Sequence, residues 1–410
     1  VAVGHGAGTA VTTGVQNVAI GGLAGDALTD ADRNIAIGYQ ALTTDDLGSR
    51  TVALGAGAVF SQNYATATDS HNIGIGDLSL FYNVTGVNNT FVGSAAGLGA
   101  SGNSHSNNTG IGKSAIGGQA LGGNTVGSNS VAVGHAALLV QNPATATDMY
   151  NVAVGHAVGL NVTTGTLNTL MGGLTGDALT SGNSNTAIGY SSLTTDTLGD
   201  RNVALGAFTL TTQNFTTSVD SYNVGVGFGA GNDITTGVQN TLVGGDAGAN
   251  LTDADINVAI GMQALNADTL GSKSVAVGAY TLIAQNFTTA TDTFNTAVGH
   301  AAGGSVTTGE QNTLMGGVAG DALTTGANNV AVGTSALGSD TLGSHSVAVG
   351  RRALLEQNLS TATNVYNVAV GSSAGQNITT GVENTLIGGL SGDALTTAGS
   401  NVAVGYLALT

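Results

Sequence analysis

The chain has 410 residues, including 67 glycines, one proline and no cysteine or tryptophan, and its formal net charge is −17. Seven basic against 24 acidic residues make nucleic acid and anionic membranes poor partners, and the lack of cysteine excludes disulfides and cysteine nucleophiles. No apolar run approaches the roughly 18 residues that a membrane span needs, so we expect no membrane insertion within residues 1–410.

A five-residue motif recurs from Val1–Gly4 to Asn401–Gly405, and Asn-Val-Ala-Val-Gly at 151–155 represents it. The steps from one closing glycine to the next are 17, 17, 17 and 21 residues, which gives an outer period of 72 residues. One copy is longer by seven residues because of an irregular insertion near 94–129. Fixed periods near 20 residues are typical of solenoids, so we expect 1–410 to form a single continuous repeat region.

In each Val-Ala-Val triplet, residues one and three share one face of an extended strand and the middle residue points to the other. Two apolar faces are typical of parallel strands that are covered on both sides. We therefore predict an all-β fold, a parallel β-roll or β-solenoid of about 23 coils, which associates with further copies of itself to cover the second apolar face. A second short strand is predicted in each coil, for example at 41–43 and 192–194.

The two faces of the strand are expected to have different partners. Residues one and three should line the chain's own core, whereas the middle residue should face the partner chains. From the second copy onward, the middle residue of the second coil is large, and these side chains are predicted to fill the interface between chains: Phe91, Leu170, Leu242, Leu314 and Leu386.

The repeated Asn/Ser-Val-Ala-Val/Ile-Gly motif resembles the head repeats of trimeric autotransporter adhesins, the YadA-like head, over essentially the whole chain. The 17-residue form, as at 34–42, also resembles repeats of bacteriophage tail fibres. The resemblance implies a homotrimeric fibre, with the chains intertwined or side by side, and an extracellular location on a cell surface or in a virion fibre. The predicted interface between chains is then a trimer interface. The adhesin repeat is shorter, so the loops of this chain are longer than those of the family.

From this resemblance we expect a stiff rod that mediates attachment to a cell or host surface, with a surface glycan or a cell-surface receptor as partner. The alternatives are a bacteriophage tail-fibre shaft for host recognition and a purely structural extracellular matrix filament. The sequence predicts no enzyme and no cofactor, because its carboxylates recur singly and do not cluster in one copy.

The four extra residues of each fourth coil are predicted to form a protruding loop, because the strand phase is restored at the next glycine. The loops place an amide beside an aromatic ring, a combination that suits sugar binding. The alternative is that the ring packs down on the coil while Gln and Asn cap the turn. The candidate ligand contacts are Gln62, Asn63, Tyr64, Gln141, Asn142, Gln213, Asn214, Phe215, Gln285, Asn286, Phe287, Gln357 and Asn358.

Other polar residues recur at a fixed phase. Asparagine opens 18 of 22 motifs, which predicts a ladder of amides hydrogen-bonded along the stack. Aspartates such as Asp45 and Asp268 are expected to form turns and not calcium sites. A base follows five residues later, as in Arg50 and Lys273, and predicts an ion pair, with a sugar- or sulfate-binding pair as the alternative. Histidines that follow the strand glycine are predicted to be surface turn residues and not metal ligands.

Overall fold

The structure is a computed structural model that describes residues 1–99, 101–102, 104–116 and 126–410. Within these residues the chain is a parallel β-solenoid of about 23 coils, without a helix. The predicted fold class is therefore confirmed. The irregular insertion expected near 94–129 includes residues 100, 103 and 117–125, which lie outside the described residues.

The chain divides into two compact units, with Val1–Asn202 and Asn214–Asp220 in unit 1 and Val203–Gln213 and Ser221–Thr410 in unit 2. Each coil begins with one short strand, called here a coil strand. The coil strands of unit 1 are β1 (Ala2–Val3), β2 (Val18–Ile20), β3 (Ile35–Ile37), β5 (Val52–Leu54), β7 (Ile73–Ile75), β8 (Thr90–Val92), β9 (Thr109–Ile111), β11 (Val131–Val133), β13 (Val152–Val154), β14 (Thr169–Met171) and β15 (Thr186–Ile188).

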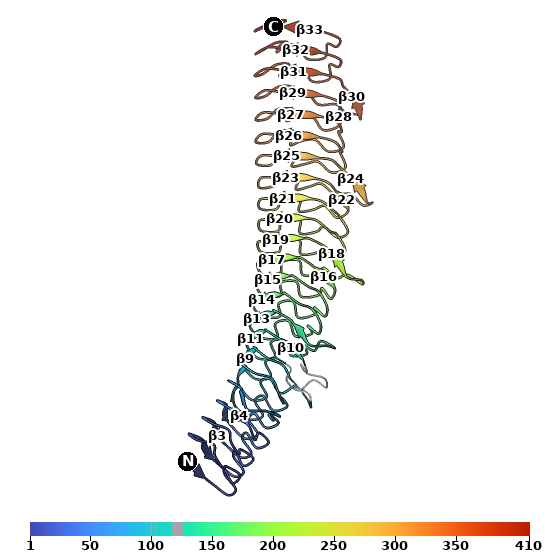
Figure 1. The fold of residues 1–410 in the computed structure, drawn as a ribbon. Helices are drawn as coiled ribbons and strands as arrows, with labels where there is room; N and C mark the ends of the chain where they lie inside the picture. The colour runs from blue at the N-terminus through green and yellow to red at the C-terminus, as the bar shows by residue number, and fades with distance from the viewer. Residues whose placement is uncertain (100, 103, 117–125) are drawn as a thin grey trace. The chain divides into compact units, whose positions relative to one another are not determined.

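The coil strands of unit 2 are β17 (Val203–Leu205), β19 (Val224–Val226), β20 (Thr241–Val243), β21 (Val258–Ile260), β23 (Val275–Val277), β25 (Thr296–Val298), β26 (Thr313–Met315), β27 (Val330–Val332), β29 (Val347–Val349), β31 (Val368–Val370), β32 (Thr385–Ile387) and β33 (Val402–Val404). Figure 1 shows these strands, from β17 to β33, stacked in chain order with one coil above the next.

Adjacent coil strands pair in parallel, so that equivalent residues of successive coils lie side by side. In β23 and β25, for example, Ala276 pairs with Ala297. Each coil strand stops after at most three residues because a glycine with a left-handed backbone follows. Gly299 has a φ of 137°, and a Cβ atom at this position would overlap the carbonyl oxygen of Gly316 in the next coil. The close stacking of coils therefore requires glycine here.

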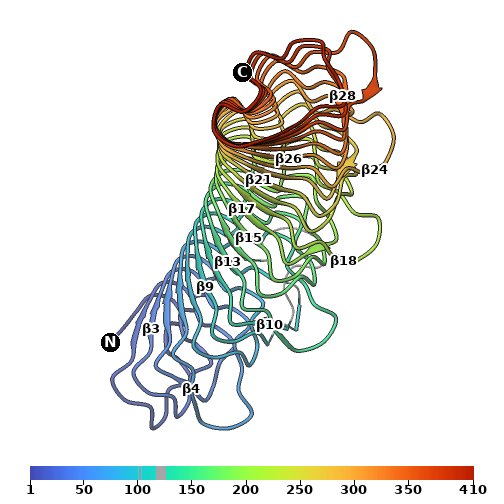
Figure 2. The ribbon, with the colours of Figure 1, turned by 90° about the horizontal axis from the view of Figure 1, so that it is seen from above.

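Two-residue strands join the end of each third coil to the loop of the fourth coil. These pairs are β4 (Gly48–Ser49) with β6 (Thr68–Asp69), β10 (Gly127–Ser128) with β12 (Thr147–Asp148), β16 (Gly199–Asp200) with β18 (Val219–Asp220), β22 (Gly271–Ser272) with β24 (Thr291–Asp292), and β28 (Gly343–Ser344) with β30 (Thr363–Asn364). Figures 1 and 2 show β24 on a loop that projects beyond the outline of the unit 2 coils. The predicted protrusion of this loop is confirmed.

The second strands predicted at 41–43 and 192–194 are wrong, because both segments are turns. Gln40 and Leu42 have φ values of 55° and 52°, and a backbone that alternates through the left-handed region cannot form an extended strand. Leu42 is nevertheless fully buried. The turn therefore contributes to the core without strand pairing.

The middle residue of each coil strand points into the chain's own core, which reverses the predicted assignment of the two faces. In β21, Ala259 is fully buried and Ile260 is 39% exposed. Apart from Ala2 in the first coil, every middle residue of the described coil strands is buried. A coil this thin admits only one inward side chain from each strand, so the two flanking residues remain on the outer face.

The residues predicted to fill a trimer interface belong to this same core, and that prediction is also wrong. Each is 0% exposed in the single chain: Phe91, Leu170, Leu242, Leu314 and Leu386. They are large because they pack against glycines. A Cβ atom on Gly231 would lie 2.7 Å from Leu242 Cδ1, and one on Gly248 would lie 2.8 Å from Leu242 Cδ2. Third coils use the opposite combination, a small Ala259 in the strand with a large Leu265 four residues after the glycine.

The predicted asparagine ladder is present, and most of its bonds run from the side chain to the backbone. Asn312 Oδ1 accepts the backbone N–H of Asn329 in the next coil at 3.0 Å, and Asn312 Nδ2 donates to the carbonyl of Gly326 at 2.9 Å. Direct amide-to-amide bonds occur in some coils, as from Asn384 Nδ2 to Asn367 Oδ1 at 3.1 Å. The ladder satisfies buried backbone groups that the short strands leave unpaired.

Candidate functional site

The fourth-coil loops start inside the core. The glutamine that opens each loop is fully buried: Gln62, Gln141, Gln213, Gln285 and Gln357. The side chain two residues later packs down on the coil, with 5% of Tyr64, 4% of Phe215 and 5% of Phe287 exposed. The asparagine between the glutamine and this side chain is half-buried at Asn142 and exposed in the other copies, at Asn63, Asn214, Asn286 and Asn358.

This arrangement contradicts the sugar-binding prediction for the glutamines and the rings. A buried amide and a buried ring offer no surface to a ligand, so these side chains are structural. The aromatic ring is removed from water because the loop folds back over the coil, and the glutamine enters the core to hydrogen-bond there. Only the asparagines of the predicted set face the solvent.

In the first, fourth and fifth copies the buried glutamine is the centre of a polar network. Gln285 Nε2 donates to Asp268 Oδ2 at 2.5 Å and to Ser274 Oγ at 2.8 Å, and Gln285 Oε1 accepts a hydrogen bond from Asn295 Nδ2 at 2.9 Å. Gln357 makes the equivalent three bonds at 2.5, 2.9 and 2.9 Å. The network therefore holds the base of the loop against the coils on both sides.

The network explains why a hydroxyl replaces asparagine in the ladder at some fourth coils. Thr51, Ser274 and Ser346 each accept a hydrogen bond from the glutamine eleven residues later. The shorter side chain leaves space for the glutamine amide. This pairing of a hydroxyl with a glutamine eleven residues on is visible in the sequence, and our sequence reasoning did not use it.

The aspartate of the network forms a turn, as predicted. Asp268 Oδ1 accepts the backbone N–H of Gly271 at 3.1 Å, and a Cβ atom on Gly271 would overlap the carboxylate. In the first copy, burial raises the pKa of the Asp45 carboxyl above its ordinary value, while hydrogen bonds from Gln62 and Gly48 oppose the shift. No positive charge lies in this network, so the amide and backbone groups stabilise the carboxylate.

The basic residues that follow these aspartates form ion pairs, as predicted. Their partners are aspartates of the loop and not the nearby buried carboxylates. Arg50 Nε lies 3.0 Å from Asp69 Oδ1, and Lys273 Nζ lies 2.5 Å from Asp292 Oδ2. Arg201 pairs with Asp220 in the same way. Each pair joins the end of the third coil to the returning part of the loop, at partly exposed positions. The interaction therefore closes the loop and contributes little to stability.

The carboxylates and histidines do not assemble into a metal site. Among the described residues, no three His, Asp or Glu side chains lie close enough to hold a metal ion. Asp30 accepts hydrogen bonds from the hydroxyls of Thr12 and Thr13, which lower its pKa. His135 and His156 stack on the surface with ring centroids 5.3 Å apart. These observations agree with turn and surface roles.

Among the described residues, only the histidine at position 105 is buried, and no sequence pattern predicted this. His105 is fully buried with its ring 5.6 Å from that of Phe91, and its Nδ1 lies 3.4 Å from Asn89 Oδ1. Its Nε2 has no hydrogen-bond partner within the described residues. Burial lowers the pKa of His105 to about 4, so the ring is neutral near pH 7.

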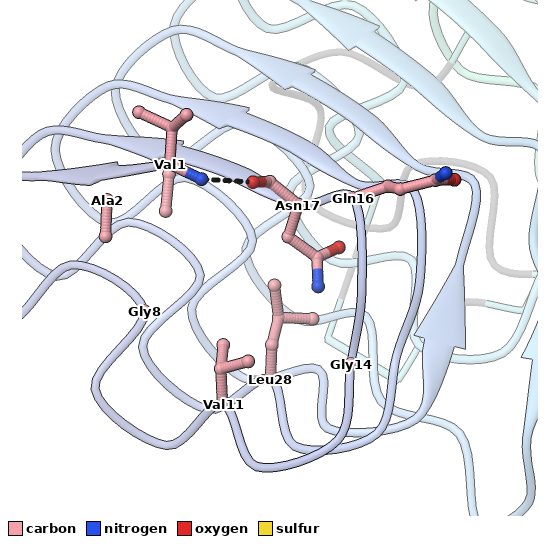
Figure 3. Close-up of a pocket in the computed structure, with 9 residues that line it drawn as sticks. Val1, Ala2, Gly8, Val11, Gly14, Gln16, Asn17 and Leu28 are labelled. Carbon is pink, nitrogen blue, oxygen red and sulfur yellow. Dashed lines mark hydrogen bonds between the residues drawn. The ribbon is translucent and has the colours of Figure 1, made fainter.

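A hollow of about 250 Å³ opens at the first coil (Figure 3). Its walls include the core positions Ala2, Ala19 and Leu28, and the amino group of Val1 donates to the carbonyl of Asn17 at 2.7 Å beside it. Equivalent core residues of later coils are covered by a neighbouring coil. The hollow is therefore the end of a stacked core and not a built ligand site.

The most extensive candidate surface is the outer face of the coil strands. We name the residues at positions one and three of the coil strands the outer strip. They are Val, Ile, Leu, Met or Thr in every coil, with no charged residue. Exposed fractions include 40% for Ile188 in unit 1, and 39% for Ile260 and 42% for Met315 in unit 2. Each unit thus carries a long, uncharged apolar surface.

No helix that is long and apolar enough to cross a membrane occurs in the described part of the chain. Comparison with protein-family models and comparison with curated proteins find no match to this chain. The outer strip and the fourth-coil loops are therefore the features of this chain that bear on its function.

Proposed function

We propose that this chain is the repeat region of an extracellular homotrimeric attachment fibre, in which copies pack outer strip against outer strip. The observation that carries the proposal is the strip itself, which is apolar, uncharged and repeated in every coil. Soluble proteins rarely leave so long an apolar surface in water, and covering it is favourable at about 25 cal/mol per Å².

A second copy of the chain suits the strip because both would have the same spacing between coils. Rows of Val and Ile that repeat about every 4.8 Å can interdigitate with identical rows along the whole contact. In unit 2, twelve coil strands give a strip of roughly 55 by 10 Å. This area is below the roughly 800 Å² that each partner buries in a standard interface. The eleven coil strands of unit 1 carry the same outer strip and add to the area that each copy can bury.

Attachment is the function that such an assembly supports best. The fourth-coil loops recur every 72 residues, and their tips are exposed and rich in threonine, as in Thr288 and Thr289. Three chains would display many identical loops, and repeated weak contacts gain strength through avidity. The adhesin and tail-fibre resemblance of the motif supplies the extracellular setting. The fibre acts by binding and not by catalysis.

Assembly is tested by placing charge on the outer strip. The variant Val258→Lys with Ile260→Lys changes two outward residues of β21, one half-buried and one 39% exposed, and leaves Ala259 in the core. Sedimentation should give three times the chain mass of 39.7 kDa for the unmodified protein and one chain mass for the variant. Its circular dichroism should be unchanged.

The matched control is Thr288→Lys with Thr289→Lys, which adds the same charge to an exposed loop tip. This control should remain trimeric. An unmodified chain that sediments as a monomer, or a strip variant that stays trimeric, contradicts the proposal. Binding of the trimer and of the monomeric variant to host cells then tests attachment, and the account expects the monomer to bind far more weakly because it loses avidity.

A further inference from the structure

One part of unit 2 departs from the repeat pattern in a way that the fold does not require. Three residues there differ in character from their equivalents in other copies. At the position of Phe228, other copies have Asp77, His156, His300 or Ser372. At the position of Asp246 they have Leu174, Val318 or Leu390, and at the position of Asn250 they have Ala178, Ala322 or Ala394. In a repeat protein, residues that serve stacking recur in every copy, so a local cluster of exceptions points to a role beyond stacking.

These residues surround a hollow of about 300 Å³, which also contacts Phe208 and Asn232. The two phenyl rings form one wall, with centroids 5.6 Å apart and planes at 77°. Phe228 is 61% exposed and Phe208 is 37% exposed. The wall is therefore an apolar platform that is open to the solvent.

The opposite wall is polar and has unused hydrogen-bonding capacity. Within the described residues, the carboxylate of Asp246 and the side-chain amide of Asn250 make no hydrogen bond, and Asn232 uses its Nδ2 to donate to Asp233 Oδ1 at 2.7 Å. Asn232 Oδ1 therefore remains an acceptor. An aspartate carboxylate, two amides and two phenyl rings thus converge on one hollow.

The backbone holds the carboxylate in place. The N–H of Asp246 donates to the carbonyl of Phe228 at 2.8 Å, and the carbonyl of Asp246 accepts from Asn266 Nδ2 at 3.0 Å. Gly229 permits this position, because a Cβ atom there would lie 2.6 Å from Asp246 Oδ1. The backbone of Asp246 is therefore held in place before a ligand arrives, and binding has to order only the side chains.

We propose that this hollow binds one ring of a neutral saccharide, an inference that rests on the attachment function and names its ligand class. A pyranose ring has an apolar face that packs on Phe228, and hydroxyls that donate to Asp246 and exchange hydrogen bonds with Asn232 and Asn250. The carboxylate and the net charge of −17 exclude anionic sugars by repulsion.

The test is saturation-transfer NMR on the full chain with N-acetylglucosamine and methyl β-galactoside as separate probes, each at about 10 mM because a single ring gives millimolar affinity. At least one probe should give transfer signals. Phe228→Ser, Asp246→Val and Asn250→Ala each introduce the residue that another copy carries at the same position, so the coil should still fold. Each variant should weaken binding at least tenfold.

The matched control is Phe294→Ser, which removes an exposed ring, 53% exposed, outside the hollow. This control should bind like the unmodified chain. Phenyl rings beside a carboxylate also suit an organic cation, so tetramethylammonium is the third probe. The proposal is overturned if tetramethylammonium binds and neither sugar does. It is also overturned if a sugar binds and none of the three hollow variants weakens that binding.

The outcome is separable from that of the proposed function. If the chain is trimeric and attaches to cells but neither sugar binds, the saccharide inference is wrong and the attachment function stands. If the hollow binds sugar but the chain is a monomer that does not attach to cells, the proposed function fails and the site stands.

Discussion

The first two coils of each 72-residue copy fill their core differently from the last two. Seven residues after the strand glycine, first and second coils carry apolar side chains, as in Ile234 and Leu251, which are both fully buried. The exception is the first coil of the second copy, which carries the buried Asn83 at this position. Third and fourth coils carry Asp268 and Gln285 at the same position, also fully buried. One backbone path thus accommodates an apolar core and a hydrogen-bonded polar core.

The difference shows what the outer period of 72 residues accomplishes. An apolar coil needs nothing beyond complementary volumes, such as Leu242 against glycine. A polar coil requires that every buried group finds a partner, and Gln285 meets that need from the longer fourth coil. The polar coils therefore anchor the loops, while the apolar coils supply hydrophobic stability.

The largest expected effect comes from a charge in the apolar coils. Leu242→Asp places a carboxylate where Leu242 contacts Gly231 and Gly248, with no partner for it, and should cost about 4 kcal/mol of local stability. Hydrogen exchange of the neighbouring coils should accelerate while distant coils stay protected. Leu242→Met, which keeps the volume, should cost less than about 1.5 kcal/mol. Equal exchange rates in the two variants would contradict this account.

A smaller loss is expected in the polar coils. Gln285→Leu keeps the approximate size but removes one buried hydrogen bond from each of Asp268, Ser274 and Asn295, at a cost of about 3 kcal/mol. Thermal unfolding and exchange of the loop amides measure the loss. Asn286→Ala, in the exposed neighbour, should change stability by less than about 0.5 kcal/mol. The polar network would be dispensable if both variants unfolded alike.

The buried His105 predicts a dependence on pH in the second copy, where its ring packs beside Phe91. Its folded-state pKa of about 4 lies below the ordinary value of 6.5, so the unfolded chain binds the proton more readily. Stability is complete above about pH 6.5 and falls toward pH 4, by roughly 2 kcal/mol between pH 8 and pH 5.

His105→Leu should flatten this pH dependence, which thermal unfolding at pH 8 and pH 5 can measure. The raised pKa of Asp45 acts in the opposite sense, because its folded form holds the proton more tightly than the unfolded chain. Comparing each variant with its parent separates the two groups. A slope that His105→Leu leaves unchanged would show that another group controls it.

The smallest effect is expected at the loop-closing ion pairs. Lys273→Ala removes the pair with Asp292, whose side chains are 36% and 49% exposed, so the loss should stay below about 1 kcal/mol and shrink in high salt. Arg50→Ala gives an independent test in unit 1. If Lys273→Ala lowered the free energy of unfolding as much as Gln285→Leu does, the exposed ion pair and not the buried glutamine would hold the loop.

The sequence predicted the solenoid, its number of coils, the asparagine ladder and the turn-forming aspartates because each follows from a residue type at a fixed period. Side-chain direction could not be predicted from apolar character alone, because Val-Ala-Val offers two apolar faces. The glycines that make space for the Leu242 side chain inside the coil indicate the direction of the middle residue. Gln285 and Phe287 were candidate ligand contacts, with packing on the coil as the alternative, because a four-residue insertion predicts a protruding loop without telling which of its side chains point outward.

The hollow at Phe228 escaped the sequence analysis for another reason. Its walls come from successive coils, and an analysis of shared motifs gives no weight to residues that break the repeat. His105 was missed because a lone histidine in an irregular segment has no periodic signal.

From the second coil onward, the middle residue of each described coil strand faces the chain's own core, and the residues on either side of it form the outer strip. Since the chain has no cysteine, Ala259→Cys and Ile260→Cys can each be labelled with a maleimide. The Ala259→Cys variant should react only after unfolding, and the Ile260→Cys variant should react in the dissociated folded chain and be protected on assembly. Rapid labelling of folded Ala259→Cys with protection of Ile260→Cys at every protein concentration would contradict the account.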